Sequence, residues 1–210
     1  RESLVKKDLL YIKSHRDFIS NLYGGLIVQE RLESLIHFMN KDWRLSDLLD
    51  FCCITYLAPS DAKTTTLISN SIDLVTSFTV LEHIPPSELK LIIAEMDRIL
   101  KRTSGLHVHR IDYTDHFAHS DKSISPINFL RYSADEWNKI AGNQFMYMNR
   151  LRHHDYLSIF NENHHIVFDE PEVSSEVRTI LPDFPLHEDF AFKSFSDLST
   201  TAAWVTVLTN

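Results

Sequence analysis

The stretch that decides the fold runs from Ser71 to Asp121 and reads SIDLVTSFTVLEHIPPSELKLIIAEMDRILKRTSGLHVHRIDYTDHFAHSD. Its apolar pattern predicts a strand over Ser71–Ser77, an amphipathic helix capped by Ser87, and a second strand over Leu106–Ile111. We expect Gly105 to end the helix in a left-handed conformation. A strand–helix–strand unit is typical of α/β sheets, whose ligands bind beyond the carboxyl ends of the strands. Here both strands end at residues able to do acid–base chemistry.

The rest of the chain extends this pattern on both sides. Residues 1–50 show helical spacing, with a break predicted at Gly24-Gly25, and a strand is predicted at Cys52–Leu57 with both cysteines buried as thiols. The C-terminal half predicts, in order, a helix that begins at a Ser133–Glu136 capping box, a helix over Arg152–Asn161, and strands over His165–Phe168 and Ala202–Leu208. The fold class is therefore α/β, with a mostly parallel sheet and one antiparallel C-terminal strand.

Composition limits the classes of function. The net charge of −8 is spread over mixed acidic and basic residues, which argues against a nucleic-acid partner. The chain has no apolar run of about 20 residues, so no membrane span is expected, and without a secretory leader a cytoplasmic location is the default. Only four glycines occur, and none forms the G-x-G-x-x-G pattern that lets a backbone approach a nucleotide closely.

Imidazole and carboxylate groups crowd the end of the second predicted strand. Asp112, Asp115 and His116 are our candidate catalytic residues, because such groups act as general bases near neutral pH. The same groups also suit a divalent metal, and Mg²⁺ near Asp112 and Asp115 is a minor alternative, although we assign no metal ligand. Alternatively, these are surface residues that only hydrogen-bond one another and have no catalytic role.

Three further places could contribute to a site. Asp61 could accept a hydrogen bond from an exocyclic amine such as that of adenine, or it could simply cap a turn. Glu82 and His83 could line a ligand cleft, or they could form a solvated helix start. Arg131 and Tyr132 belong to an aromatic–arginine tract, over residues 128–133 and 147–152, that could cover the site as a lid or could be a packed loop.

The motifs together resemble the class I S-adenosylmethionine-dependent methyltransferases of the type 11 group. The resemblance rests on Asp61-Ala62, on the run D-L-V-x-S-x-x-V-L-E-H-I over residues 73–84, and on E-x-x-R-x-L-K over residues 95–101. It implies S-adenosylmethionine as cofactor and a Rossmann-like sheet. It also implies cofactor-binding residues Asp61, Ala62, Ser77, Phe78 and Thr79, and substrate-binding residues Glu82, His83, Arg131 and Tyr132.

The chain departs from this family at its beginning. The family's first strand with its glycine-rich loop, and the acidic residue after its second strand, have no counterpart here. We therefore expect an N-terminally incomplete chain, a single partial methyltransferase domain over residues 1–210 with a helical lead-in over 1–50. Its N-terminal strands would be missing, and the Ser71–Ser77 strand would have an open edge through which chains could associate. We expect S-adenosylmethionine to bind weakly or not at all.

Three functions follow, in decreasing order of preference. The first is methyl transfer from S-adenosylmethionine to an oxygen or nitrogen of a small molecule or glycan. The second is a catalytically silent, methyltransferase-like binding module. The third is a metal-dependent hydrolase, against which the length counts, since barrels of that kind need about 250 residues.

Overall fold

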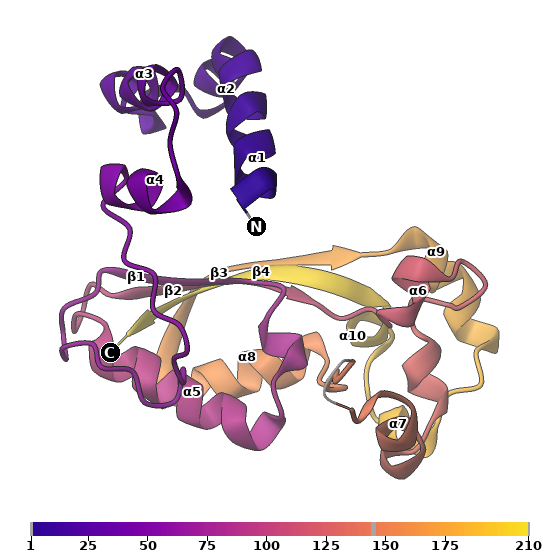
Figure 1. Ribbon diagram of the computed structural model, residues 1–210. Helices are drawn as coiled ribbons and strands as arrows, with labels where there is room; N and C mark the ends of the chain where they lie inside the picture. Colours follow the sequence, from indigo (N-terminus) through magenta and orange to yellow (C-terminus); the bar gives the residue numbers. More distant parts are fainter. Residues whose placement is uncertain (1, 144–145, 210) are drawn as a thin grey trace. The chain divides into compact units, whose positions relative to one another are not determined.

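The computed structural model describes residues 2–143 and 146–209. The chain divides into two compact units, Arg1–Ser60 and Asp61–Asn210 (Figure 1). Among the described residues, no helix has both the length and the apolar character that crossing a bilayer requires.

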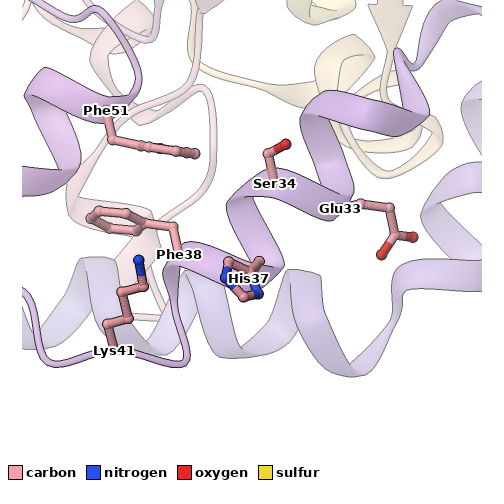
Figure 2. Close-up of a pocket in the computed structure, with 6 residues that line it drawn as sticks. All are labelled: Glu33, Ser34, His37, Phe38, Lys41 and Phe51. Atoms are coloured by element: carbon pink, nitrogen blue, oxygen red, sulfur yellow. The ribbon is translucent and has the colours of Figure 1, made fainter.

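The first unit is helical, as predicted. Its helices are α1 (Glu2–Ser14), α2 (Arg16–Tyr23), α3 (Gln29–Phe38) and α4 (Leu45–Phe51). The predicted break is confirmed, since Gly24 has a φ of 52° and opens a 3₁₀ turn over Gly24–Leu26. A small core of Leu9, Trp43 and Leu48 holds the helices together. Phe38 stacks on Phe51 with ring centroids 4.5 Å apart, beside a shallow hollow between α3 and α4 (Figure 2).

The strand predicted at Cys52–Leu57 is wrong. Cys53 has a φ of 56°, and the Ile54 N–H donates to Leu49 O at 2.8 Å, so these residues close the end of α4 in a Schellman motif. Residues 54–60 then run on without regular structure. Both cysteines are exposed rather than buried. The apolar run ends a helix and does not pair with a strand of the described sheet.

The second unit contains one four-stranded sheet in the order β1-β2-β4-β3. Its strands are β1 (Leu74–Phe78), β2 (Leu106–Asp112), β3 (His164–Val173) and β4 (Thr200–Thr209). β1 is parallel to β2, and β4 is antiparallel to both β2 and β3. Three strands therefore run in one direction and the C-terminal strand runs against them, which confirms the predicted α/β sheet. β1 is an edge strand among the described residues, where the resemblance places the family's first strand.

This open sheet is incompatible with the barrel that a hydrolase of the third kind would need. Such a barrel has eight strand–helix units, whereas the residues described here form four strands with two free edges. The barrel hydrolase is the least favoured of the three functions, and the described sheet gives it no support.

The helix between β1 and β2 differs from its prediction at both ends. α5 (Pro86–Ile99) begins one residue before Ser87, and Pro85 takes the N-cap position, because a proline in the first turn has the φ that a helix needs. At the other end, Gly105 has no positive φ; Thr103 takes the left-handed conformation instead, with a φ of 62°.

The remaining helices are α6 (Phe117–Ser120), α7 (Ala134–Ala141), α8 (His153–Asn161), α9 (Ser175–Ile180) and α10 (Phe195–Ser199). Two of them, α7 and α8, were predicted, whereas α6, α9 and α10 were not. The Ser133–Glu136 capping box is confirmed in both directions, with Ser133 Oγ accepting from the Glu136 N–H and the Glu136 side chain accepting from the Ser133 N–H.

Two apolar clusters stabilise this unit. In the first, α5 and α8 lie on the same side of the sheet (Figure 1) and bury Leu89, Ile93 and Phe160 against β2 and β4. The second cluster forms around Phe129 and Trp137 and joins α7 to the segments that precede β4. Each such side chain contributes about 1.5–3 kcal/mol by leaving water. The two clusters fix the loops that follow β1 and β2.

Candidate functional site

The carboxyl ends of β1 and β2 lie at the same edge of the sheet. Because the two strands are parallel, with Phe78 opposite Arg110, the segments that follow them leave the sheet side by side. β1 continues into a 3₁₀ turn over Leu81–His83, and β2 continues into the loop that starts at Asp112. The acidic and imidazole groups of both segments meet there, as the sequence predicted.

Glu82 is the most unusual side chain at this edge. It is only 2% exposed, and neither of its carboxylate oxygens has a hydrogen-bond partner within the described part of the chain. Burial raises the pKa of Glu82 to about 7, although nearby peptide N–H groups and His83 oppose this in part. A carboxyl group with such a pKa can hold or release a proton near neutral pH.

Three histidine rings stand in a row beside Glu82. The His83 and His116 ring centroids are 4.7 Å apart, and those of His116 and His119 are 4.8 Å apart. His83 Nδ1 lies 2.9 Å from Tyr147 O, so this nitrogen donates and Nε2 retains its lone pair. The rings present several nitrogens to a small volume.

Asp112 faces this row from the end of β2. Its Oδ1 accepts from the Thr114 N–H at 2.8 Å and from the Thr114 hydroxyl at 2.6 Å. Its Oδ2 lies 3.7 Å from His116 Nε2 and 3.6 Å from His119 Nε2. Burial lowers the pKa of His116, and the charge of Asp112 opposes that effect. A neutral imidazole beside a carboxylate is suited to accept a proton.

Asp115, the third predicted catalytic residue, is held in a different way. It is fully buried; Oδ1 accepts from the Phe117 N–H at 2.9 Å and Oδ2 accepts from Asn128 Nδ2 at 3.1 Å. Burial raises the pKa of Asp115. Both oxygens thus brace the loop, and the predicted catalytic role of Asp115 stays a prediction.

The predicted cofactor-binding residues fall into two groups. Ser77, Phe78 and Thr79 end β1 beside the site: Ser77 Oγ lies 2.8 Å from His109 Nδ1, and the Phe78 ring is 64% exposed. Asp61 and Ala62 lie in an exposed turn instead, where Asp61 Oδ1 accepts from the Lys63 N–H at 2.9 Å. This is the turn-cap alternative for Asp61, and no strand precedes it.

Tyr132 packs against the second apolar cluster, and Arg131 is an exposed residue beside it. The Arg131 guanidinium lies 5.1 Å from the Phe184 ring centroid, and the Tyr132 ring stacks on Trp137 with centroids 6.2 Å apart. These contacts match the packed-loop alternative. Their predicted role in substrate binding stays a prediction.

Sequence reasoning missed Asn149 as a positioning residue. Its Nδ2 donates to Leu81 O at 3.0 Å and to Ile84 O at 2.9 Å, and its backbone N–H donates to Glu82 O at 2.8 Å. Asn149 therefore fixes the turn that carries Glu82 and His83. The tract over residues 147–152 suggested a lid, and nothing in a single sequence indicates that an asparagine 65 residues downstream binds Ile84.

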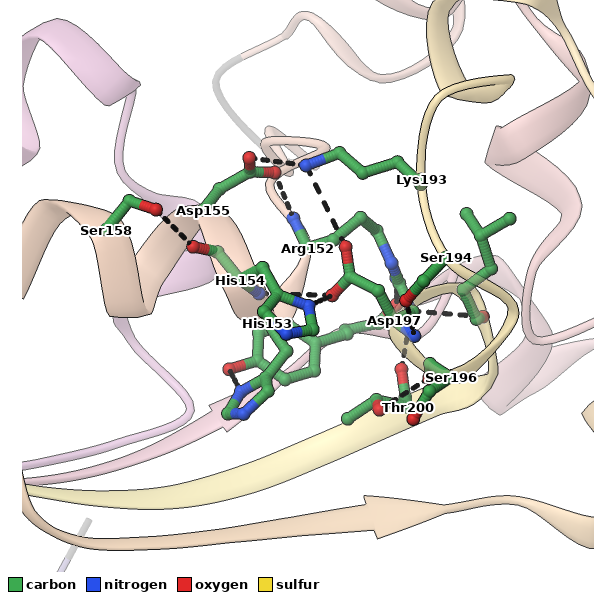
Figure 3. Close-up of polar contacts among 12 residues, drawn as sticks. Arg152, His153, His154, Asp155, Ser158, Lys193, Ser194, Ser196, Asp197 and Thr200 are labelled. Atoms are coloured by element: carbon green, nitrogen blue, oxygen red, sulfur yellow. Dashed lines mark hydrogen bonds and ion pairs between the residues drawn. The ribbon is translucent and has the colours of Figure 1, made fainter.

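Arg152 is the second residue that was missed. It is completely buried, and its guanidinium donates to Tyr113 O at 2.8 Å, to Asp197 O at 3.2 Å and to Thr200 O (Figure 3). Burial lowers the pKa of Arg152 to about 10, while the charge of Asp197 opposes that effect. Arg152 ties the residue after β2 to the start of β4 and so supports the site loop from behind.

The glycines of this chain do not form a cofactor cradle. An added Cβ would lie 2.6 Å from Lys101 O at Gly105 and 2.1 Å from Asn138 Oδ1 at Gly142, so both are packed against their own chain. Gly24 and Gly25 meet no atom within 4 Å and lie in the helical unit. The described residues therefore do not fit the glycine-rich cradle that a dinucleotide or S-adenosylmethionine usually requires.

Comparison with known proteins gives one family match. Residues 36–108 match the family described as "Methyltransferase domain". No curated protein sequence matches the chain.

Several solved structures are similar in part. A geranyl diphosphate methyltransferase in complex with SAM is 11% identical, with a TM-score of 0.49 over 84% of this chain and 65% of that one. The MccD protein is 14% identical, with a TM-score of 0.48 over 85% and 76%. Geranyl diphosphate C-methyltransferase from Streptomyces coelicolor A3(2) is 12% identical, with a TM-score of 0.43 over 72% and 52%. The chain thus spans between 52% and 76% of the length of these structures.

The family match covers the β1 strand, the whole of α5 and the start of β2, which carry the motifs quoted above. It confirms the resemblance: over this segment the chain is similar to a methyltransferase domain.

Proposed function

We propose that residues 61–210 form the acceptor side of a methyltransferase that methylates an oxygen or nitrogen of a small molecule or glycan, with S-adenosylmethionine as donor. The observation that carries this proposal is the convergence of Glu82, Asp112 and His116 from the ends of two adjacent parallel strands. The family match supports methyl transfer in general. The choice of an oxygen or nitrogen as methyl acceptor rests only on the acid–base groups at the site.

The chemistry of these residues is the removal of the acceptor's proton. A hydroxyl or protonated amine must lose a proton when it gains a methyl group, and an imidazole whose pKa is lowered by burial is neutral and able to take it. Asp112, 3.7 Å from His116 Nε2, would stabilise the imidazolium that results. Such a positioned base contributes about 10²–10⁴-fold to rate.

The test is a methyl-transfer assay with labelled S-adenosylmethionine and a panel of phenols, amines and glycans. We expect His116→Asn and Asp112→Asn each to lower kcat by about 10²-fold or more, with KM changed less. His165→Ala is the matched control, since His165 is an exposed histidine on β3 outside the site. Unchanged turnover in both site variants would remove the proposed base.

A second candidate function is that of a catalytically silent binding module. Two observations favour it: the absence of a glycine cradle and the exposed turn at Asp61 and Ala62. Calorimetric titration separates the two candidates. Micromolar binding of S-adenosylmethionine to this chain would favour the enzyme, and its absence would favour the silent module. An acceptor that binds without any methyl transfer would favour the silent module.

A further inference from the structure

The groups around Glu82 have the composition of a metal site. One donor atom each from Glu82, His83 and His116 lies within 4.8 Å of the other two. Two imidazoles and one carboxylate are the ligands of open sites for zinc and related divalent metals. We propose that Glu82, His83 and His116 bind a divalent transition-metal ion of the zinc class.

The unpaired atoms of this group are the independent evidence. Both oxygens of Glu82 and Nε2 of His116 are buried, and among the described residues none of them has a hydrogen-bond partner. Leaving a buried acceptor unpaired is unfavourable, because the group has lost its hydrogen bonds to water. Since one oxygen of Glu82 and one ring nitrogen of His116 lie within 4.8 Å of each other, a single cation between them would give these residues the partner they lack.

The surroundings already orient the donor atoms. Tyr147 O accepts from His83 Nδ1 at 2.9 Å, which leaves Nε2 of His83 as the ligand atom. A backbone carbonyl in this position is the usual outer partner of a metal-binding histidine. Asn149 holds the turn that carries Glu82 and His83. His83 is exposed, so one side of the ion would be open to water or to an acceptor.

Two other groups of this composition are less suited to an ion. In the Asp112–His116–His119 group, His119 Nε2 is bonded to Thr114 Oγ1 at 3.0 Å, and Thr114 also donates to Asp112 Oδ1. In the Asp97–His107–His164 group, the carboxylate already accepts from both imidazoles, at 3.0 and 2.7 Å. Asp112 Oδ2, 3.7 Å from His116 Nε2, is placed to become a fourth ligand of the proposed ion.

The site deepens the proposed function on which its catalytic role rests. A bound cation would hold the acceptor's oxygen or nitrogen and make its proton easier to lose, because it stabilises the anion that forms. Binding itself does not depend on methyl transfer. With the ion bound, His116 would be a ligand, the cation would replace it in activating the acceptor, and the acceptor's proton would leave to water at the open side. With no ion bound, His116 is the proposed base, so the two proposals fail separately.

The test is calorimetric titration of the chain with Zn²⁺, together with the absorption spectrum of the Co²⁺-loaded protein. We expect one ion per chain and Co²⁺ bands in the visible range. Glu82→Gln, which preserves the shape of the side chain, and His83→Ala should each weaken binding by at least about tenfold. His165→Ala, an exposed histidine elsewhere in the same unit, should leave the affinity unchanged.

Circular dichroism and the melting temperature of each variant show that it is folded. Zn²⁺ binding retained in the His83→Ala/His116→Ala double variant would place the ion elsewhere and overturn the inference. Loss of binding in His164→Ala with retention in Glu82→Gln would overturn it as well, since it would assign the ion to the Asp97 group. A wild-type chain that binds no Zn²⁺ or Co²⁺ at millimolar concentration would do the same.

Discussion

His164 donates from Nε2 to Asp97 Oδ1 at 2.7 Å, while its Nδ1 lies 2.8 Å from Phe160 O. Both partners are acceptors, so both ring nitrogens carry a hydrogen and the ring is an imidazolium. The hydrogen bond to Asp97 raises the pKa of His164, against the effect of burial. This ion pair joins the start of β3 to α5 beneath the sheet.

We expect the stability of the protein to fall as the pH rises through neutrality because of this pair. The folded state binds the His164 proton more tightly than the unfolded state does, so the stabilisation is complete below the ordinary value of 6.5 and is lost as the pH rises through the higher folded value. The free energy of unfolding in urea at pH 5.5 and pH 8.5 measures this loss. The His164→Phe variant should show a smaller change than the wild type.

Asp97 makes the stability of the protein depend on pH in the opposite direction, at acid pH. Burial raises its pKa, but the hydrogen bonds from His107 and His164 outweigh burial and lower the pKa of Asp97 to about 2. Its stabilisation is therefore present above the ordinary value of 3.8 and is lost as the pH falls toward 2. Asp97→Asn should flatten the acid limb. An identical pH profile in wild type, His164→Phe and Asp97→Asn would contradict the pair.

We expect the loss of the Asn149 side chain to destabilise the protein through the turn that carries the site residues. Asn149→Leu leaves Ile84 O unpaired and removes one of the two donors to Leu81 O, and we expect a loss of about 1–3 kcal/mol in the free energy of unfolding. Asn161→Ala, at the exposed end of α8, should change stability by no more than about 0.5 kcal/mol. Equal effects of the two substitutions would show that the turn over Leu81–His83 does not depend on Asn149.

Local patterns predicted most of the sheet and the helices that pack on it. The apolar stripe of α5, the capping box at Ser133 and the strands β2 and β4 are set by residues close together in the sequence. The error at Cys52–Leu57 has a local cause too. An apolar run can end a helix or form a strand. Here Cys53 adopts the left-handed conformation, so the run ends the helix.

The site could be predicted only as far as its residue types. The parallel pairing of β1 and β2 brings Glu82, Asp112 and His116 together, which the strand–helix–strand pattern implied. Tertiary contacts decide which carboxylate lacks a hydrogen-bond partner. Asn128 donates to Asp115, while the Glu82 carboxylate has no hydrogen-bond partner among the described residues. The supports from Asn149 and Arg152 come from distant parts of the chain and leave no signal in their own neighbourhood.

We expect substitution of Arg152 to destabilise the protein more than substitution of Asn149. Arg152→Met removes the guanidinium donors to Tyr113 O, Asp197 O and Thr200 O, and it removes a buried positive charge that interacts with Asp197. We expect the free energy of unfolding to fall by at least about 3 kcal/mol, measured in urea by tryptophan fluorescence. Arg102→Met, at an exposed arginine, is the control, with a change of no more than about 0.5 kcal/mol expected. Matching losses would contradict a special role for Arg152.

Gly105 is required for close packing and not for a positive φ. A Cβ on residue 105 would lie 2.6 Å from Lys101 O and 2.8 Å from Leu100 Cβ, and Gly105 O accepts from the Thr209 N–H at 3.1 Å, so the backbone cannot shift without loosening β4. We therefore expect Gly105→Ala to lower the free energy of unfolding by about 1–3 kcal/mol. Gly25→Ala, whose Cβ would meet no atom within 4 Å, should be neutral or stabilising by about 0.4–1 kcal/mol. If Gly105→Ala were as stable as Gly25→Ala, the turn before β2 would have to relax freely, and the tie between Gly105 and Thr209 would not hold this end of the sheet.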